Sequence, residues 1–266
     1  MKTQQCIVCN GQQKYYFSKN FDVYDLVKAD YWRCENCGFT SSKTHFDMDD
    51  ATWALLNDAF HKDAFAREDN PYNRNQRYFN QALMLSLAKK HNILEGNDWL
   101  DWGCGVGSLS GQLSSHFGLH IDNFDMFVRP QLNAVAEEDL SIRSYSLVVN
   151  TAVFEHVRSR DTLNEIEQYV QDNGTLAVHT LVRGEIPADP DWMYLLPVHC
   201  AFHTNKSMDI LMQQWGYTCS VYNEHAKLWL LFKLDPGLVE NKTKKLNDIL
   251  GWQYLHFKTG FMDFWP

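Results

Sequence analysis

The chain has 266 residues, of which 33 are acidic and 24 basic, giving a net charge of −9, and 45% of its residues are hydrophobic. This composition is typical of a globular protein and excludes a mainly disordered, collagen-like or low-complexity chain. The acidic balance removes the global basic field that non-specific nucleic-acid binders use, which disfavours nucleic acid as a partner. No apolar run approaches the ~20 residues of a membrane span, and the N-terminus has no hydrophobic stretch like that of a signal peptide. We therefore expect a cytoplasmic protein without a membrane partner.

The N-terminal segment, residues 1–45, carries two C-x-x-C pairs. Their members are Cys6, Cys9, Cys34 and Cys37, and a glycine follows each pair closely, as tight metal-binding knuckles require. In a reducing compartment this spacing favours metal ligation over a disulfide framework, four free thiols or a redox pair. Four thiolates make a closed tetrahedral site that has no open position for chemistry. The segment is therefore predicted to be a zinc ribbon with a structural Zn²⁺ ion, and the β-forming residues between the pairs would supply its strands.

The next segment, residues 46–95, is predicted to be a helical bridge. The stretch NRNQRYFNQALMLSLAKKHN has apolar residues at helical spacing. Asn70-Pro71 before it is a natural start or break of a helix.

Between residues 96 and 235 the pattern alternates between strands and helices. Strands are predicted at 97–103, 119–125, 144–154 and 175–182, with a closing pair at 218–225 and 227–235. Helices are predicted at 108–118, 161–174 and 205–216, the first ended by Gly118 and the second by the Asn173-Gly174 turn. Alternation of this kind predicts an α/β domain with a doubly wound sheet and a parallel core.

The last segment, residues 236–266, has a tail rich in aromatic residues. We expect this tail to dock on the main domain or on a second subunit, which makes a homodimer a candidate assembly. The alternative is that the aromatic side chains close a substrate pocket.

A glycine-rich turn follows the first strand of the α/β domain. In WLDWGCGVGSLSGQL, Asp101 ends the strand, Gly103, Gly105 and Gly107 follow, and a helix begins near Ser108. Glycines let the backbone approach a ligand closely, and the unpaired N–H groups of the helix N-terminus face it. A dinucleotide fold has the spacing G-x-G-x-x-G/A, in which Ser108 would occupy the third glycine position. A nicotinamide cofactor is therefore disfavoured.

The residues Leu100 to Gly107 resemble motif I of the class I S-adenosylmethionine (SAM) methyltransferases, in its form LDxGCGxG. The resemblance implies a Rossmann-like sheet of seven strands with SAM as the cofactor. Asp125, at the end of the next strand, is at the place where an acid of this family binds the ribose of SAM. The connection after it is short, so Glu137, Glu138 and Asp139 are candidates for the adenine contact. The implied cofactor-binding residues are Asp101, Gly103, Cys104, Gly105, Gly107, Asp125, Met126 and Asn150.

A further segment, LVVNTAVFEHV at 147–157, resembles the branch that includes ubiquinone-biosynthesis and sugar methyltransferases. The stretch PVHCAFHTNKSMDILMQQWGY continues that resemblance. It implies methyl transfer to an oxygen or carbon of a small polar metabolite, such as a sugar or sugar nucleotide. A hydroxyl acceptor needs a positioned base, and histidine suits that task at neutral pH. The candidate bases are His156, His199 and His203, with His179 a further candidate, although His156 could instead orient a loop.

Two other functions remain open at this point. One is methylation of an RNA base, because some ribosomal RNA methyltransferases also begin with a cysteine-rich zinc module. The other is a non-catalytic module that binds SAM while its zinc ribbon recruits a partner.

Overall fold

A computed structural model of the chain describes residues 4–66, 74–128, 130 and 132–264. The central sheet has four parallel strands at one end and antiparallel strands at the other. Its strands, in spatial order, are β6 (Asp122–Phe124), β5 (Trp99–Trp102), β7 (Tyr145–Thr151), β8 (Val170–His179), β12 (Leu228–Phe232), β11 (Cys219–Asn223) and β13 (His256–Thr259). The expected α/β fold is confirmed, and its sheet is mixed.

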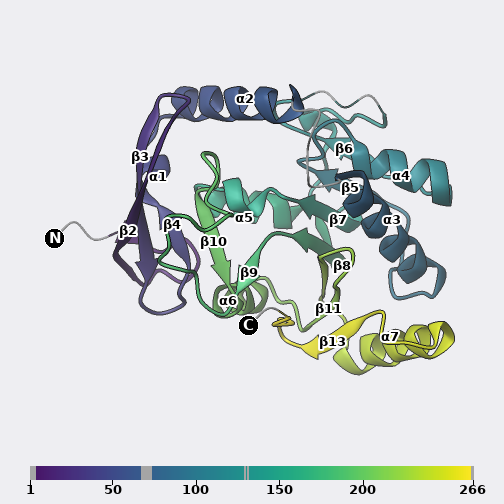
Figure 1. Cartoon of the computed structure of the whole chain (residues 1–266). Coiled ribbons are helices and arrows are strands. Elements are labelled where there is room, and N and C mark those ends of the chain that lie inside the picture. Colours follow the sequence, from purple (N-terminus) through teal and green to yellow (C-terminus); the bar gives the residue numbers. More distant parts are fainter. Residues whose placement is uncertain (1–3, 67–73, 129, 131, 265–266) are drawn as a thin grey trace.

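Helices cover both faces of this sheet (Figure 1). Strand β7 is buried along its whole length, and its side chains alternate between two apolar clusters, as the two-residue period of a strand requires. Leu147 and Val149 pack with α3 (Arg74–Lys90), α4 (Ser108–Phe117) and α7 (Pro236–Leu250). Val148 packs with α5 (Arg160–Gln168) and α6 (Asn205–Gln214) on the opposite face. Burial on both faces explains why the central strands are continuous apolar runs.

A second sheet of six strands joins the N-terminal segment to residues far along the chain. Strands β2 (Gln12–Val23) and β3 (Leu26–Cys34) form a long antiparallel hairpin. The order is β1 (Gln4–Gln5), β2, β3, β4 (Thr40–Ser42), β10 (Ala201–Thr204) and β9 (Val182–Arg183). The pairing of Phe202 with Thr40 places β10 against the N-terminal hairpin. Residues 4–42 therefore share one sheet with residues 182–204, which the sequence patterns do not indicate.

Helices connect the two sheets along one side of the molecule. The short α1 (Lys43–Phe46) leads into α2 (Asp50–Ala66), which runs from the hairpin toward the parallel end of the central sheet (Figure 1). The predicted helices at 46–95 are thus found as α2 and α3, and Asn70-Pro71 lies outside the described residues. No helix in the described part of the chain is long and apolar enough to cross a membrane.

The predicted helix at 161–174 is wrong at its C-terminal end. Helix α5 ends at Gln168, and Val170 already pairs with Tyr145 as the first residue of β8. The Asn173-Gly174 pair lies within that strand, at a register irregularity between Tyr145 and Leu147 of β7. A Cβ atom at Gly174 would lie 2.8 Å from Cγ1 of Val170. A glycine is needed because Val170 and the backbone of Gln171 leave no room for a side chain at this irregularity.

The connection between β6 and β7 is short and irregular, as we expected. It holds only the 3₁₀ turn η1 (Glu137–Asp139) and one parallel bridge between Asn123 and Ala134 among its described residues. The short connection supplies no further strand to the sheet among its described residues. The seventh strand, β13, comes from the C-terminal tail and pairs with β11 at the edge opposite β6.

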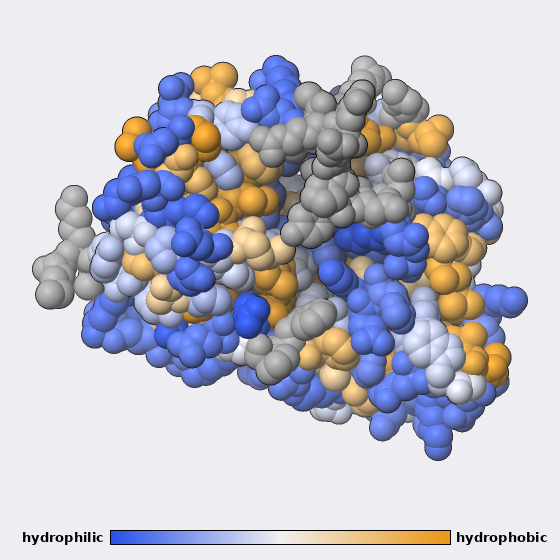
Figure 2. Space-filling view, in the orientation of Figure 1, coloured by the Kyte–Doolittle hydropathy of each residue, from blue (hydrophilic) through white to orange (hydrophobic). Residues whose placement is uncertain are grey.

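The C-terminal tail docks on the central sheet of its own chain. Phe261 stacks on Trp229 with ring centroids 5.4 Å apart, and the indole N–H of Trp229 donates to the carbonyl of Met262 over 2.8 Å. Phe264 packs on Tyr222 with centroids 4.7 Å apart. On the face shown in Figure 2, hydrophobic residues lie in small groups among hydrophilic ones, which is usual for a surface in water.

Candidate active site

The glycine-rich turn lies between β5 and α4, at the carboxyl end of the parallel strands. Gly103, Gly105 and Gly107 all have positive φ angles, of 77°, 57° and 81°. A Cβ atom at Gly103 would lie 2.5 Å from Cγ2 of Val153, so that position must be glycine for packing. A Cβ atom at Gly105 would meet nothing within 4 Å. Open space beside Gly105, next to the N-terminus of α4, is a cradle in which a ligand can contact the backbone.

Asp101, at the end of β5, is a buried acid beside this turn whose pKa is strongly shifted. Its side chain is 1% exposed and its Oδ1 atom has no hydrogen-bond partner. Burial, and then the charge of Asp125, raises the pKa of the Asp101 carboxyl to about 7. An unpaired buried carboxylate is costly, and a bound cationic group would offset that cost.

Asn150, on the neighbouring strand β7, is also buried beneath the turn. Its side-chain N–H₂ donates to the carbonyl of Trp102 over 3.0 Å, and its Oδ1 atom has no partner. Two unsatisfied oxygens, on Asp101 and Asn150, therefore lie at the ends of adjacent strands, where α/β proteins bind ligands.

Asp125 follows β6 and lies against the turn. Its Oδ2 atom accepts the backbone N–H of Gly105 over 2.8 Å, and its Oδ1 atom accepts the N–H groups of Phe127 and Val128. These bonds hold the carboxylate at the rim of the cradle. Met126, beside it, is 58% exposed.

Of the other residues predicted to contact the cofactor, Cys104 is buried in the turn, whereas the three acids of η1 are exposed. Cys104 is buried, and its backbone N–H donates to the carbonyl of Phe124 over 3.1 Å. Burial raises the pKa of the Cys104 thiol, which keeps it protonated. The three candidates for the adenine contact, Glu137, Glu138 and Asp139, are all exposed on η1.

Two of the predicted histidines lie together beyond the turn. His156 is the last residue of the 3₁₀ turn η2 (Phe154–His156), and this turn directly follows Val153. His199 lies two positions before β10. Their ring centroids are 5.0 Å apart. Removal from water, and then the neighbouring His199, lowers the pKa of His156 to about 3. Burial lowers the pKa of His199 to about 4. Both imidazoles are therefore neutral at physiological pH.

The structure does not bring His203 into this pair. His203 is 1% exposed and packs between Phe39 and Phe154, on the side of the N-terminal sheet. His179 ends β8, where its Nδ1 bonds the carbonyl of Lys227 over 2.6 Å. Its Nε2 lies 3.3 Å from a guanidinium nitrogen of Arg77.

Glu155 and Tyr194 are two residues of the site that we did not predict from the sequence. The Tyr194 hydroxyl donates to Oε1 of Glu155 over 2.7 Å. The carbonyl of Tyr194 lies 2.8 Å from Nδ1 of His199. The position of Glu155 beside His156 was a usable signal, whereas nothing local marked Tyr194.

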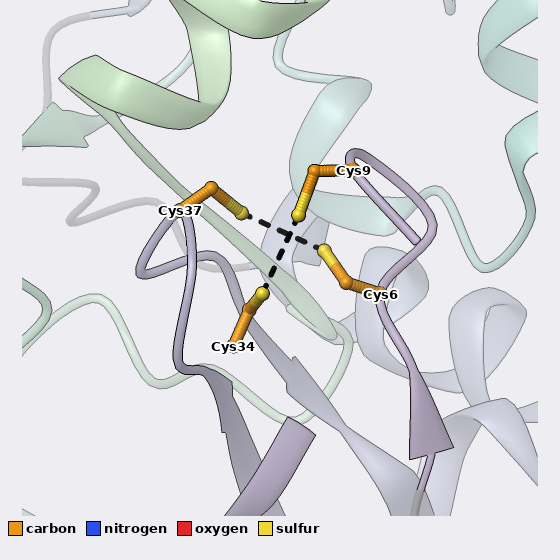
Figure 3. Close-up of side chains that lie close together, drawn as sticks. All are labelled: Cys6, Cys9, Cys34 and Cys37. Carbon is orange, nitrogen blue, oxygen red and sulfur yellow. Dashed lines mark hydrogen bonds between the residues drawn. The ribbon is translucent and has the colours of Figure 1, made fainter. Parts of the chain in front are cut away.

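The four cysteines of the N-terminal segment point toward one another (Figure 3). The Sγ atoms of Cys6 and Cys37 are 3.6 Å apart, those of Cys9 and Cys34 are 3.5 Å apart, and all four lie within 4.8 Å of one another. A zinc ion with bonds of ~2.3 Å to four thiolates sets neighbouring sulfurs ~3.8 Å apart. The donor set therefore fits a tetrahedral zinc ion.

The family model described as "Methyltransferase domain" matches residues 72–221, which include the glycine turn, Asp125 and the histidine pair. The chain belongs to this methyltransferase family. The expectation of an enzyme is confirmed, and the family supports SAM as the methyl donor. No curated protein matches this methyltransferase.

Solved structures similar to this methyltransferase are distant in sequence. The plantazolicin methyltransferase BpumL, in complex with a pentazolic analogue and S-adenosylhomocysteine, is 11% identical with a TM-score of 0.49, and the match covers 68% of this chain and 96% of that one. DesVI of Streptomyces venezuelae is 14% identical with a TM-score of 0.42, over 71% of this chain and 100% of that one. A SAM-dependent methyltransferase of Thermotoga maritima is 14% identical with a TM-score of 0.38, over 64% and 98%.

Proposed function

We propose that this methyltransferase transfers the methyl group of SAM to an oxygen or carbon of a small polar metabolite, such as a sugar or sugar nucleotide. The proposal includes membership of the branch that contains ubiquinone-biosynthesis and sugar methyltransferases. The observation that supports a transfer reaction is that the glycine-rich turn packs directly against the segment that carries the histidines. Gly103 of the cofactor turn packs against Val153, two residues before the Glu155-His156 pair. A donor held at the turn and an acceptor held at the histidines would therefore be neighbours.

The residues around the turn are suited to the two ends of SAM. When bound, SAM would supply a methyl group on a sulfonium centre, and the acceptor would displace S-adenosylhomocysteine from that methyl group directly. The unpaired carboxylate of Asp101 would accept the ammonium group of the cofactor, and the open face of Gly105 would let its backbone approach. The Asp125 carboxylate, at the rim, would accept a hydroxyl group of the ribose through the remaining lone pair of Oδ2, because its other acceptor sites hold backbone N–H groups. Cys104 would fill the turn, while Met126 and Asn150 would contact the cofactor from either side.

On the acceptor side, the chain's own residues hold and move a proton. A neutral imidazole has a lone pair that can accept a hydroxyl proton, and His156 and His199 are both neutral, although their lowered pKa values make them weaker bases than a free histidine. His156 is the best candidate of the group, because the residue is half-buried and its Nδ1 atom has no hydrogen-bond partner, whereas His199 is almost fully buried and its Nδ1 is bonded to the carbonyl of Tyr194. We assign the proton-accepting role to His156. His203, enclosed by aromatic rings, would serve packing.

We further propose that Cys6, Cys9, Cys34 and Cys37 hold a structural zinc ion. The reducing cytoplasm would keep these thiols available. Residues 1–45 would then be a zinc-ribbon module, 46–95 a bridge, 96–235 the SAM-binding domain and 236–266 the docked tail.

A transfer assay tests the reaction. The protein is incubated with methyl-labelled SAM and separate pools of sugar nucleotides, small hydroxylated metabolites, peptides and total RNA. We expect label in a sugar or small-metabolite pool together with release of S-adenosylhomocysteine. Label in RNA alone would support the RNA methyltransferase instead. Binding of SAM without transfer to any pool would support the non-catalytic module.

The glycine at position 105 permits a matched test of the cofactor cradle. Gly105 and Gly118 both have positive φ angles, of 57° and 63°, and a Cβ atom at either meets nothing within 4 Å. Alanine at either position should therefore cost a similar ~1–2 kcal/mol of backbone strain. We expect Gly105→Ala to weaken SAM binding at least tenfold by calorimetry, because the methyl group enters the cradle, and Gly118→Ala to leave it unchanged. Equal affinities for the two variants would place the cofactor elsewhere.

A further inference from the structure

Glu155, His156 and His199 form a group whose ligand atoms all lie within 4.8 Å of one another. Two chain segments supply it, namely η2 after β7 and the residues just before β10. A hydrogen bond of 2.8 Å from the backbone N–H of Cys200 to the carbonyl of Glu155 ties the segments together. The group is thus held by the backbone as well as by side chains, and a preformed site of this kind needs little rearrangement to take a ligand.

Tyr194 binds one oxygen of Glu155 and one nitrogen of His199, and the second ligand atom of each side chain is left available. Its hydroxyl donates to Oε1 of Glu155, and Oε2 of that carboxylate, on a side chain 2% exposed, has no partner. Its carbonyl accepts the N–H at Nδ1 of His199, so the lone pair of that ring is at Nε2. The Nδ1 atom of His156 is buried and also has no partner.

We propose that Glu155, His156 and His199 bind a divalent transition-metal ion beside the methyl-donor turn. One carboxylate and two neutral imidazoles are ligands that first-row divalent ions accept. The two contacts from Tyr194 act as the supporting hydrogen bonds that orient metal ligands and fix the histidine tautomer. A cation also satisfies the unpaired Oε2 of Glu155, which otherwise remains buried without compensation.

Three protein ligands leave at least one position of such an ion open. A hydroxyl oxygen bound there loses its proton more easily, because the ion stabilises the resulting anion. In the metal-loaded enzyme His156 is a ligand of the ion, and the proton lost by the bound hydroxyl passes to solvent water. His61, on α2, has its ring centroid 5.8 Å from that of His156 and lies outside the group of three ligand atoms. The binding of the ion does not itself depend on methyl transfer.

Cobalt titration of the purified protein, with zinc retained in the cysteine site, tests the proposal. We expect one equivalent of Co²⁺ to bind and to give the visible absorption of nitrogen and oxygen ligation, without the intense near-ultraviolet band of thiolate ligation. No binding, or binding only with the thiolate band, would overturn it and leave Glu155, His156 and His199 as a proton relay. No SAM or acceptor is present, so the result is independent of the transfer assay.

Variants locate the ion. We expect His199→Gln to weaken Co²⁺ binding at least tenfold, and Tyr194→Phe, which keeps all three ligands, to weaken it ~10-fold or more. His203→Gln is the control, because it removes a buried imidazole outside the group and should keep the wild-type affinity. Equal loss in His203→Gln and His199→Gln would contradict the assignment. If His199→Gln does not fold, the wild-type titration and Tyr194→Phe still decide the question.

Discussion

Replacing Cys34 by serine is expected to release the proposed structural zinc ion and to destabilise the six-stranded sheet. Cys34 is the last residue of β3, and its thiol faces that of Cys9 over 3.5 Å. Structural zinc sites contribute ~10–16 kcal/mol in isolated peptides. Losing one of four ligands should therefore remove several kcal/mol, or on the order of 10 °C in melting temperature for a chain of this size. Zinc content by mass spectrometry and thermal unfolding measure the two effects.

The matched control is Cys219→Ser, in strand β11. Cys219 is fully buried but lies outside the cysteine cluster, so its replacement tests the loss of a buried thiol alone. We expect this variant to keep one zinc ion per chain and to be destabilised by only ~1–2 kcal/mol. A Cys34→Ser protein that kept its zinc and melted like the wild type would refute the structural role of the ion.

The contacts of the four-cysteine cluster indicate which residues the loss of zinc should also destabilise. Thr204, the last residue of β10, donates its hydroxyl to the carbonyl of Cys37, and β10 follows His199 by two positions. Loss of zinc should therefore loosen the histidine group as well as the N-terminal hairpin. Amide exchange in residues 199–204 would rise in Cys34→Ser if this connection holds.

Replacing Asp101 by asparagine is expected to stabilise the cofactor-free protein at pH 8 and to weaken its binding of SAM. The carboxyl has an ordinary pKa of 3.8, and burial raises it to about 7 in the folded protein. Between these two values the folded state holds a proton that the unfolded state has lost. Stability therefore falls as the pH rises from about 4 to about 7, by up to ~4 kcal/mol at about 1.36 kcal/mol per pKa unit. An asparagine side chain does not titrate, so the variant should lose this pH dependence.

We expect bound SAM to stabilise the charged form of Asp101, because the proposed contact with its ammonium group would compensate that charge. We expect Asp101→Asn to lower SAM affinity at least tenfold at pH 8, measured by calorimetry alongside denaturant unfolding. Asp98→Asn makes the same charge change on an exposed residue just before β5 and should alter neither quantity. An Asp101→Asn protein with wild-type affinity for SAM would show that Asp101 does not face the cofactor.

Local patterns were sufficient to predict most secondary structure of the α/β domain. Alternating apolar runs predicted the strands, and turn glycines such as Gly118 correctly ended helix α4. The Asn173-Gly174 pair misled because the same two residues suit a helix end and a strand irregularity. Only the pairing of Val170 with Tyr145, a contact between distant residues, separates the two.

The sequence by itself determined the methyltransferase fold class, the glycine turn and the spacing of the cysteine pairs. These are properties of neighbouring residues, since periodicity, positive φ and ligand spacing are set within a few positions of the chain. Only the tertiary structure decided that β10 joins the N-terminal sheet, that β13 completes the central one, and that Glu155 meets His199. Those contacts join residues 34 or more positions apart. At such separations an apolar strand could pair with several partners of similar composition. Which pairing forms depends on how the whole chain buries its apolar faces, and no local pattern encodes that choice.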